Sequence, residues 1–221
     1  YPEWLVLGYL RNQRLIESPA QVESITVDWD VGAAAVRTRA GLPQLEARTA
    51  QRIVTTGCGQ GSVFASVMEA ANAIQLDPDA RLRQSQLYAI LRAVREQDSV
   101  YKRAGSVHGC ALFRDEELLI FVEDVGRHNA VDTIAGWTWL QGGALLRGDD
   151  KVFYTTGRLT SEMILKAAQM GVPIVVSRSG ITQMGLEVAE RLGLCAIGRA
   201  THTRFLCYTH PERLVWDTPL P

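Results

Sequence analysis

The stretch KVFYTTGRLTSEMILKAAQMGVPIVVSRSGITQMGLEVAERLGLCAIG, residues 151–198, decides the fold. Three short apolar segments in it have the length and composition of buried strands: 151–156, 172–177 and 194–198. Between them, two intervals repeat apolar residues at helical spacing: 160–170 and 182–192. Strand, helix, strand, helix, strand predicts a parallel, right-handed βαβαβ unit, and therefore an α/β protein.

The two helical intervals carry their own boundary signals. Thr160 and Thr182 stand where an N-cap hydroxyl is favoured. Gly171 and Gly193 stand where a helix can end on a left-handed residue. Because parallel strands need a crossover between them, these boundaries support the predicted order of elements.

The middle and the beginning of the chain add further elements. SVHGCALF (106–113) and ELLIFVED (117–124) flank the turn RDEE, which predicts a β-hairpin. Near the N-terminus, ITVDWD (25–30) and AAAVRTRA (33–40) are expected to pair as strands. Helical periodicity is present in two more segments: 84–97 and 127–140.

Composition limits the class of protein. The chain has 221 residues, 47% of them hydrophobic, and a formal net charge of −1, so broad electrostatic binding of nucleic acid is not indicated. We expect an N-terminal segment of helix and strands over 1–50 and a main α/β domain over 51–221. No apolar run is long enough for a membrane span or has the form of a signal peptide. The first residue is not methionine, so we expect a piece to be missing before it.

Four cysteines are scattered along the chain without the C-x-x-C pairs of a metal site, which favours reduced thiols in the cytoplasm. One of them, Cys58, stands among glycines in RIVTTGCGQGSVFA (52–65). A strand is expected to enter at 52–55 and a helix to begin near Ser62. Glycine permits conformations that other residues resist, whereas a packing cysteine belongs on a stiff element.

The position of Cys58 favours a reactive thiol. A thiol near a helix N-terminus has a lowered pKa and a larger thiolate fraction. A flexible loop would also let one sulfur reach two destinations, as thiol exchange between a donor and an acceptor requires. Two alternatives stay open, a structural cysteine and a phosphate-cradling glycine loop, although neither phosphate-loop motif is present.

EDVGRHNAVD, residues 123–132, gathers charged and polar side chains at an expected helix start. Arg127 and His128 are costly to desolvate, so they need partners or a ligand. His128 is a candidate general base, or a hydrogen-bonded hinge residue. The alternative interpretation is a capped, salt-bridged helix N-terminus.

Arginines follow each of the three predicted parallel strands. Open α/β sheets bind ligands at the carboxyl ends of their strands, where helix N-termini present N–H groups. Basic side chains there, with hydroxyl donors such as Ser179, suit a phosphate or diphosphate. The alternative is that some of these arginines are merely solvated: Arg158, Arg178, Arg199 and Arg204.

Four motifs closely resemble the formate dehydrogenase accessory protein family, the FdhD-type sulfur carriers. They are FVEDVGRHNAVDTIAGW (121–137), TTGRLTSEMILKAAQMGVPIVVSRSGIT (155–182), LEVAERLGLCAIG (186–198) and YTHPERL (208–214). The likeness runs from about Trp4 to Leu214. It implies a three-layer α/β/α sandwich of the cytidine deaminase-like kind, and a cytoplasmic homodimer.

The resemblance also implies a function. Members of this family act as sulfurtransferases that take persulfide sulfur from a cysteine desulfurase. They pass it to the molybdenum bis-guanine-dinucleotide cofactor, which molybdenum-dependent formate dehydrogenase requires. The protein would hold this cofactor as an acceptor, with GDP as a mimic, and would hold no metal directly.

By the same likeness, Cys58 falls on the persulfide-carrying cysteine and RATHTR (199–204) on the cofactor-binding stretch. We expect guanine nucleotides to bind across the carboxyl ends of the parallel strands. The resemblance and the charge patterns together give one catalytic residue, Cys58, and a cofactor-binding set: Arg199, Ala200, Thr201, His202, Thr203, Arg204, Arg158, Ser179, Arg127 and His128.

One departure from the family pattern opens an alternative function. Gly61 stands where the family has the second cysteine of a C-x-x-C loop. The chain could therefore be a nucleotide- or cofactor-binding accessory protein without its own sulfur transfer. A zinc deaminase is a weaker rival, because VHGCA (107–111) has His108 without the glutamate of H-x-E, and no C-x-x-C exists.

Overall fold

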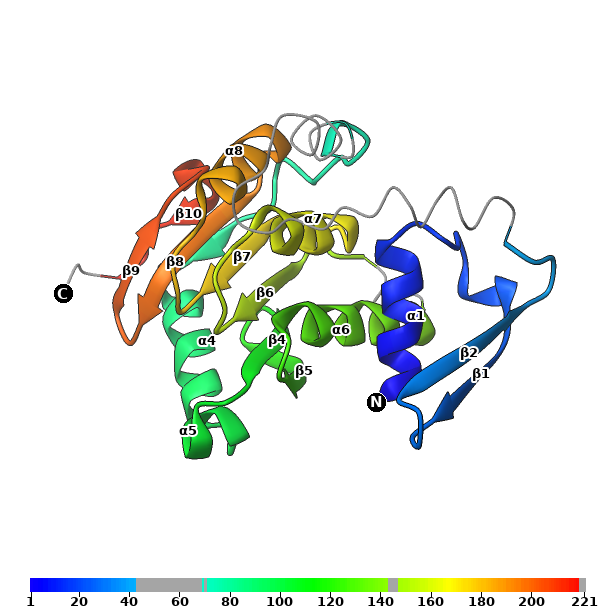
Figure 1. Cartoon of the computed structure of the whole chain (residues 1–221). Coiled ribbons are helices and arrows are strands. Elements are labelled where there is room, and N and C mark those ends of the chain that lie inside the picture. Colours follow the sequence, from blue (N-terminus) through cyan, green and yellow to red (C-terminus); the bar gives the residue numbers. More distant parts are fainter. Residues whose placement is uncertain (43–68, 70, 143–146, 219–221) are drawn as a thin grey trace.

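The structure is a computed structural model that describes residues 1–42, 69, 71–142 and 147–218 (Figure 1). A six-stranded mixed sheet forms its centre, in the order β5-β4-β6-β7-β8-β9. The inner strands β6, β7 and β8 run parallel, and antiparallel strands flank them on both sides. The strand bounds are β4 His108–Arg114, β5 Glu117–Asp124, β6 Lys151–Thr155, β7 Ile174–Ser177, β8 Cys195–Thr201 and β9 Arg204–Cys207.

Helices cover both faces of this sheet. On one face α6, α7 and α8 pack against the strands, and on the other face lies α4, with the short α5 following it (Figure 1). The helix bounds are α1 Pro2–Asn12, α4 Gln84–Glu96, α5 Val100–Ala104, α6 Arg127–Gln141, α7 Ser161–Gln169 and α8 Gln183–Leu192. The mixed α/β class is therefore confirmed, while the cytidine deaminase-like arrangement stays a prediction.

The inner strands β6, β7 and β8 are mostly apolar because both of their faces are buried. In β6, Phe153 packs into the cluster under α6, α7 and α8, whereas Val152 and Tyr154 face the cluster under α4. Burial of a Phe or Val side chain is worth roughly 1.5–3 kcal/mol. The unbroken apolar runs in the sequence thus reflect two cores, one on each side of the sheet.

The predicted βαβαβ unit is confirmed, with two differences at its edges. β7 begins at Ile174, after Pro173, which has no N–H to donate to a ladder. β8 does not end at residue 198 but continues to Thr201, because β9 pairs with it as an antiparallel hairpin. Thr182 caps α8 by accepting from the Gly185 N–H at 3.1 Å, but the Thr160 hydroxyl makes no such bond at the start of α7.

Two small sheets lie outside the central one. β1 Val22–Asp28 and β2 Ala33–Thr38 form the expected N-terminal hairpin, which lies beyond α1 at the far end from β9 (Figure 1). β3 Leu82–Arg83 pairs in parallel with β10 Leu214–Val215, which ties the end of the chain to the start of α4. The division of the chain at residue 50 stays a prediction.

The helices α1 and α6 approach closely through two glycines. A Cβ at Gly8 would lie 1.7 Å from the carbonyl oxygen of Asp132, and one at Gly136 would lie 1.9 Å from that of Trp4. Beside this contact, the Asn12 amide donates to the buried Asp132 carboxylate at 2.6 Å. A backbone contact this close tolerates no side chain at either position.

The substitution Gly136→Ala should therefore destabilise the protein by at least about 2 kcal/mol, within the roughly 1–3 kcal/mol typical of overpacking. Urea unfolding followed by circular dichroism measures this change. Gly180→Ala is a matched control, because its added Cβ would meet nothing closer than the Tyr208 hydroxyl at 3.9 Å. Equal effects of the two substitutions would contradict the close packing of α1 on α6.

Candidate functional site

The loops that follow the three parallel strands are tied into one surface. The Ser177 hydroxyl donates to the Gly157 carbonyl at 2.7 Å, so the loop after β7 holds the loop after β6. The Arg199 N–H donates to the Ser179 carbonyl at 2.7 Å and joins β8 to the same surface. Side chains from distant parts of the sequence therefore meet at this edge of the sheet.

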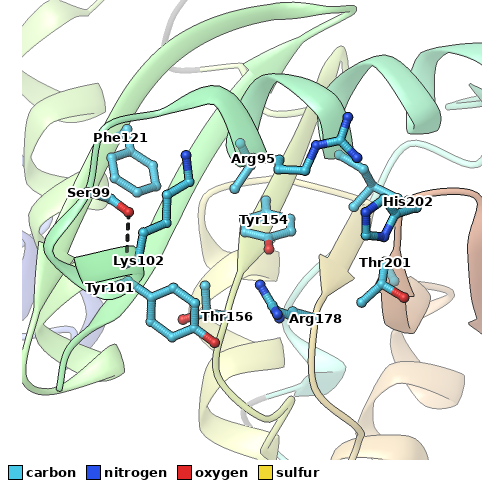
Figure 2. A pocket seen from close by; sticks show the side chains of 13 residues that line it. Arg95, Ser99, Tyr101, Lys102, Phe121, Tyr154, Thr156, Arg178, Thr201 and His202 are labelled. Atoms are coloured by element: carbon cyan, nitrogen blue, oxygen red, sulfur yellow. Dashed lines mark hydrogen bonds between the residues drawn. The ribbon is translucent and has the colours of Figure 1, made fainter. Parts of the chain in front are cut away.

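A pocket opens at this edge, on the side of the sheet that α4 covers (Figure 2). It contains about 610 Å³ of empty space, including the part open to solvent. Its lining residues are Leu91, Val94, Arg95, Ser99, Tyr101, Lys102, Phe121, Tyr154, Thr156, Arg178, Ala200, Thr201 and His202.

The chemistry of this pocket suits an anion that carries a flat, apolar part. Arg95, Lys102 and Arg178 supply positive charge, and among the residues that the structure describes no Asp or Glu lines the pocket. The Arg178 guanidinium lies 5.6 Å from the centre of the Tyr101 ring, in cation–π range. Burial raises the pKa of Tyr154 to about 12, so its hydroxyl stays protonated and can donate.

Two hydrogen-bond acceptors, the Glu123 carboxylate and the Ser99 hydroxyl, hold the segment that carries the rim residues Tyr101 and Lys102. Glu123, near the end of β5, accepts from the backbone N–H groups of Val100 and Tyr101, both at 2.8 Å. Ser99 begins α5 and accepts from the Lys102 N–H at 3.2 Å, as the dashed line in Figure 2 marks. A helix of five residues is thereby fixed against the pocket.

The predicted stretch 199–204 forms the other wall, as a hairpin between β8 and β9. Ala200, Thr201 and His202 line the pocket, and His202 occupies the left-handed region with a φ of 54°. Thr201 pairs with Arg204, so His202 and Thr203 form the turn. Side chains alternate along a strand, and Phe205 packs into the core under α4. Arg204 therefore points away from that face.

A second group of predicted residues meets on the side of α6 and α7. Arg127 and His128 occupy the first turn of α6, and Arg158 lies in the loop before α7. The Arg127 side chain crosses Gly157, where a Cβ would lie 2.7 Å from the Arg127 Cδ and 3.4 Å from the His108 Nδ1. The structure thus divides the predicted set: these residues do not line the pocket.

Burial and neighbouring positive charges disfavour protonation in this second group. Burial, together with the Arg127 guanidinium, lowers the pKa of His108. Burial also lowers the pKa of Arg127, and the Arg158 guanidinium lowers it further. Burial lowers the pKa of His128, although the Glu162 carboxylate opposes this shift.

His128 is the outer end of a charged network that reaches the N-terminal helix. Its Nε2 lies 3.4 Å from the Glu162 carboxylate, close enough for an ion pair but without hydrogen-bond geometry. Lys166 lies 3.1 Å from Glu162 and 2.9 Å from Asp132. Asp132 in turn accepts from Asn12, which completes a chain of contacts between α7, α6 and α1.

Comparisons with known proteins agree along the whole chain. The model of the FdhD/NarQ family matches residues 1–215. The chain belongs to the FdhD/NarQ family. Sulfur carrier protein FdhD of Bacillus subtilis is 32% identical over 96% of this chain and 80% of its own length. The protein of that name from Halalkalibacterium halodurans is 34% identical over 96% of this chain and 78% of its own length.

A solved structure supports the fold of this FdhD/NarQ member. It is described as a formate dehydrogenase accessory protein from Desulfotalea psychrophila, and it superposes with a TM-score of 0.73 at 28% identity. The match covers 97% of this chain and 80% of that one. The resemblance seen in the sequence motifs is therefore confirmed. Within the described residues, no helix is long and apolar enough to cross a membrane.

The predicted catalytic residue of this FdhD/NarQ member, Cys58, lies outside the described residues, as does Gly61. The three other thiols are described and free. Cys110 and Cys195 are fully buried. Cys207 is half-buried, and its sulfur lies 3.8 Å from that of Cys195.

Several pocket residues of this FdhD/NarQ member escape prediction from the sequence. Arg95, Tyr101 and Lys102 follow no parallel strand, and they reach the pocket only because α4 and α5 pack across the opposite face of the sheet. The one available signal is the run of polar and basic residues at the end of the helix predicted over 84–97. Arg178 followed a predicted strand and does line the pocket.

The lowered pKa of His108 in this family member predicts a specific pH dependence of stability. The unfolded chain binds the proton first as the pH falls, near the ordinary value of about 6.5. The contribution of His108 is therefore present above that pH and is lost as the pH falls through the lower folded pKa. In His108→Gln, unfolding free energy measured in urea should decrease less between about pH 7 and about pH 5 than in the wild type.

His202→Gln changes an exposed ring far from His108 in sequence and serves as the control for the substitution itself. A His108→Gln protein whose stability follows the wild-type curve throughout this range would contradict the assigned environment of His108.

Proposed function

We propose that this protein accepts persulfide sulfur from a cysteine desulfurase on Cys58 and passes it to the molybdenum bis-guanine-dinucleotide cofactor of formate dehydrogenase. The cofactor is the substrate here, held while the sulfur is delivered. Membership of the FdhD/NarQ family and the named sulfur carrier relatives support the sulfur chemistry. The observation that carries the acceptor side is the cationic, aromatic pocket at the carboxyl edge of the sheet.

The environments of the described thiols support Cys58 as the carrier. Exchange requires a thiolate with access to both donor and acceptor. Burial raises the pKa of Cys110 to about 12, and its thiol contacts the Thr155 hydroxyl at 3.3 Å. The neighbouring Cys207 and burial raise the pKa of Cys195. Neither of these two buried thiols suits a carrier, which leaves Cys58 and Cys207.

The pocket supports a guanine nucleotide as the bound part of the acceptor. Arg178 can donate charge-assisted hydrogen bonds to a diphosphate, with Arg95 and Lys102 on the facing rim. Tyr101 and Phe121 offer apolar, aromatic surface against which a purine can stack. The strand ends alone would support only some phosphorylated ligand, and the guanine comes from the family resemblance.

A second candidate function keeps the nucleotide site but omits the sulfur transfer. Gly61 removes the second thiol of the loop, so any shuttle between two cysteines is absent from that position. In this alternative the protein binds the cofactor and assists its insertion. The cytoplasmic location and the homodimer belong to the proposal in either form.

Sulfur on Cys58 distinguishes the two functions. After incubation with a cysteine desulfurase and cysteine, the Cys58 peptide should gain one sulfur, a mass increase of about 32 Da, because exchange transfers a single sulfane atom. Mass spectrometry of the native protein measures it. Cys58→Ser should lose the adduct and the sulfuration of the cofactor, whereas Cys207→Ser should keep both. An undiminished adduct in Cys58→Ser would move the chemistry to another cysteine.

Calorimetry with GDP tests the pocket. Arg178→Gln should weaken binding at least about tenfold, or about 1.4 kcal/mol, because it removes a partly desolvated charge-assisted contact. Arg92→Gln is the matched control, since Arg92 lies exposed on α4 and does not line the pocket. Equal losses in the two variants, or no GDP binding by the intact protein, would remove the nucleotide from this site.

A further inference from the structure

Arg127 lies in the first turn of α6 and Arg158 in the loop before α7, and no side-chain partner explains the position of these two arginines. Within the part of the chain that the structure describes, Arg127 and Arg158 form no ion pair or hydrogen bond. They are close enough that the charge of Arg158 lowers the pKa of Arg127. Arg127 is half-buried and Arg158 is exposed, so the two like charges repel across the boundary between protein and solvent, and a bound anion would relieve this repulsion.

Nearby acidic groups are already engaged elsewhere. Glu162 is held by Lys166 at 3.1 Å and lies beside His128. The Asp124 carboxylate accepts from the Gly126 N–H at 2.7 Å and from the Asn129 amide at 3.0 Å. The Glu162 charge is near enough to oppose the lowering of the Arg127 pKa, but neither carboxylate lies within ion-pair distance of the two guanidinium groups. Both guanidinium groups can therefore still bind an added anion directly.

Several buried polar atoms around Arg127 and Arg158 also lack partners. They belong to both helix starts and to the facing strand β4. The Thr160 hydroxyl is the most enclosed of them, since its residue is 7% exposed. Three of these atoms have no partner, and they are His108 Nδ1, Arg127 Nε and Thr160 Oγ1; the fourth, His128 Nε2, lies 3.4 Å from Glu162 but makes no hydrogen bond. In folded proteins such atoms nearly always bond to protein or water, so these are free to bond to ligand oxygens.

The two helices that start here have unused N–H groups. Neither Gly126 at the start of α6 nor Thr160 at the start of α7 provides a side-chain cap. The helices have 15 and 9 residues, long enough to carry a positive N-terminal end. N–H groups at two helix starts, two guanidinium groups and two imidazoles are a donor set for a tetrahedral oxyanion.

We propose that Arg127, Arg158, His108 and His128 form a second anion site that binds a phosphate group, separate from the nucleotide pocket. Gly157 makes room for this site, because its lack of a side chain lets the Arg127 side chain lie across the Gly157 backbone. The preceding residue, Thr156, lines the nucleotide pocket. The two sites therefore lie on opposite sides of one short piece of backbone. The donors are the same whether the phosphate is free or part of a bound nucleotide.

The four histidines allow both sites to be followed in one NMR experiment on the full chain. His108 and His128 belong to the proposed site, His202 lines the nucleotide pocket, and His210 contacts Glu212 elsewhere. Inorganic phosphate should shift the ring signals of His108 and His128 saturably, with little effect on the other two. GDP should shift the signal of His202.

Two arginine variants separate the sites. Arg127→Gln should weaken phosphate binding at least about tenfold, whereas Arg178→Gln should leave it within about twofold of the wild type. Gly157→Ala keeps every charge but displaces the Arg127 side chain, so it should also weaken phosphate binding. Gly180→Ala is its control.

Loss of GDP binding alone, with phosphate binding retained, would overturn the proposed nucleotide pocket but not the second anion site.

The results also identify the source of the phosphate. Weaker GDP binding in Arg127→Gln would show that a nucleotide phosphate reaches the second site, and unchanged GDP binding would assign the site to free phosphate. No saturable shift of His108 and His128 with phosphate, together with unchanged GDP binding in Arg127→Gln, would overturn the proposal. Phosphate binding lost in Arg178→Gln and retained in Arg127→Gln would overturn it as well.

Discussion

The structure depends on three parallel strands whose two faces are both buried. A strand enclosed in this way carries mostly apolar side chains, with polar ones such as Lys151, Thr155 and Ser177 at its ends, and its backbone groups are satisfied by its neighbours. Backbone N–H groups without a neighbouring strand to bond to therefore occur where β6, β7 and β8 end together. Charged and hydroxyl side chains gather at that edge, where they can be solvated or meet a ligand.

This constraint explains why the fold could be predicted from the sequence. Apolar runs bounded by Thr160, Gly171 and Gly193 carry both the strand positions and the helix limits. The extension of β8 to Thr201 could not be predicted, because Arg199 and Thr201 are polar and exposed and the segment owes its strand conformation to pairing with β9. The short α5 was also missed. It depends on Glu123, which lies more than 20 residues further along the chain.

The site was predictable only in part, for a related reason. Proximity to the end of a parallel strand drew attention to Arg178, and the family resemblance drew attention to Ala200 to His202; all of these residues line the pocket. It gave no information about which side of the sheet each residue would reach. Arg127 and Arg158 share the edge with Arg178, but they lie on the side of the sheet that α6 and α7 cover, whereas Arg178 lines the pocket on the α4 side. The single pocket predicted from the sequence therefore corresponds to two separate groups of positive charge. To assign each arginine to its side of the sheet, one must know which helices cover which face, and the periodicity of the sequence does not give this information.

The contact between α1 and α6 has a consequence for how the chain is made. Asn12 and its buried partner Asp132 are 120 residues apart in sequence. During synthesis α1 leaves the ribosome long before α6 exists, and although the hairpin β1–β2 can pack against part of its surface, the side that contacts α6 has no partner in the meantime. Pairings this distant in sequence form late, because a long loop has to close first. The helix α1 is thus among the last elements to be fixed in place, and until then the Asp132 carboxylate of the network that ends at His128 lacks its hydrogen bond from Asn12.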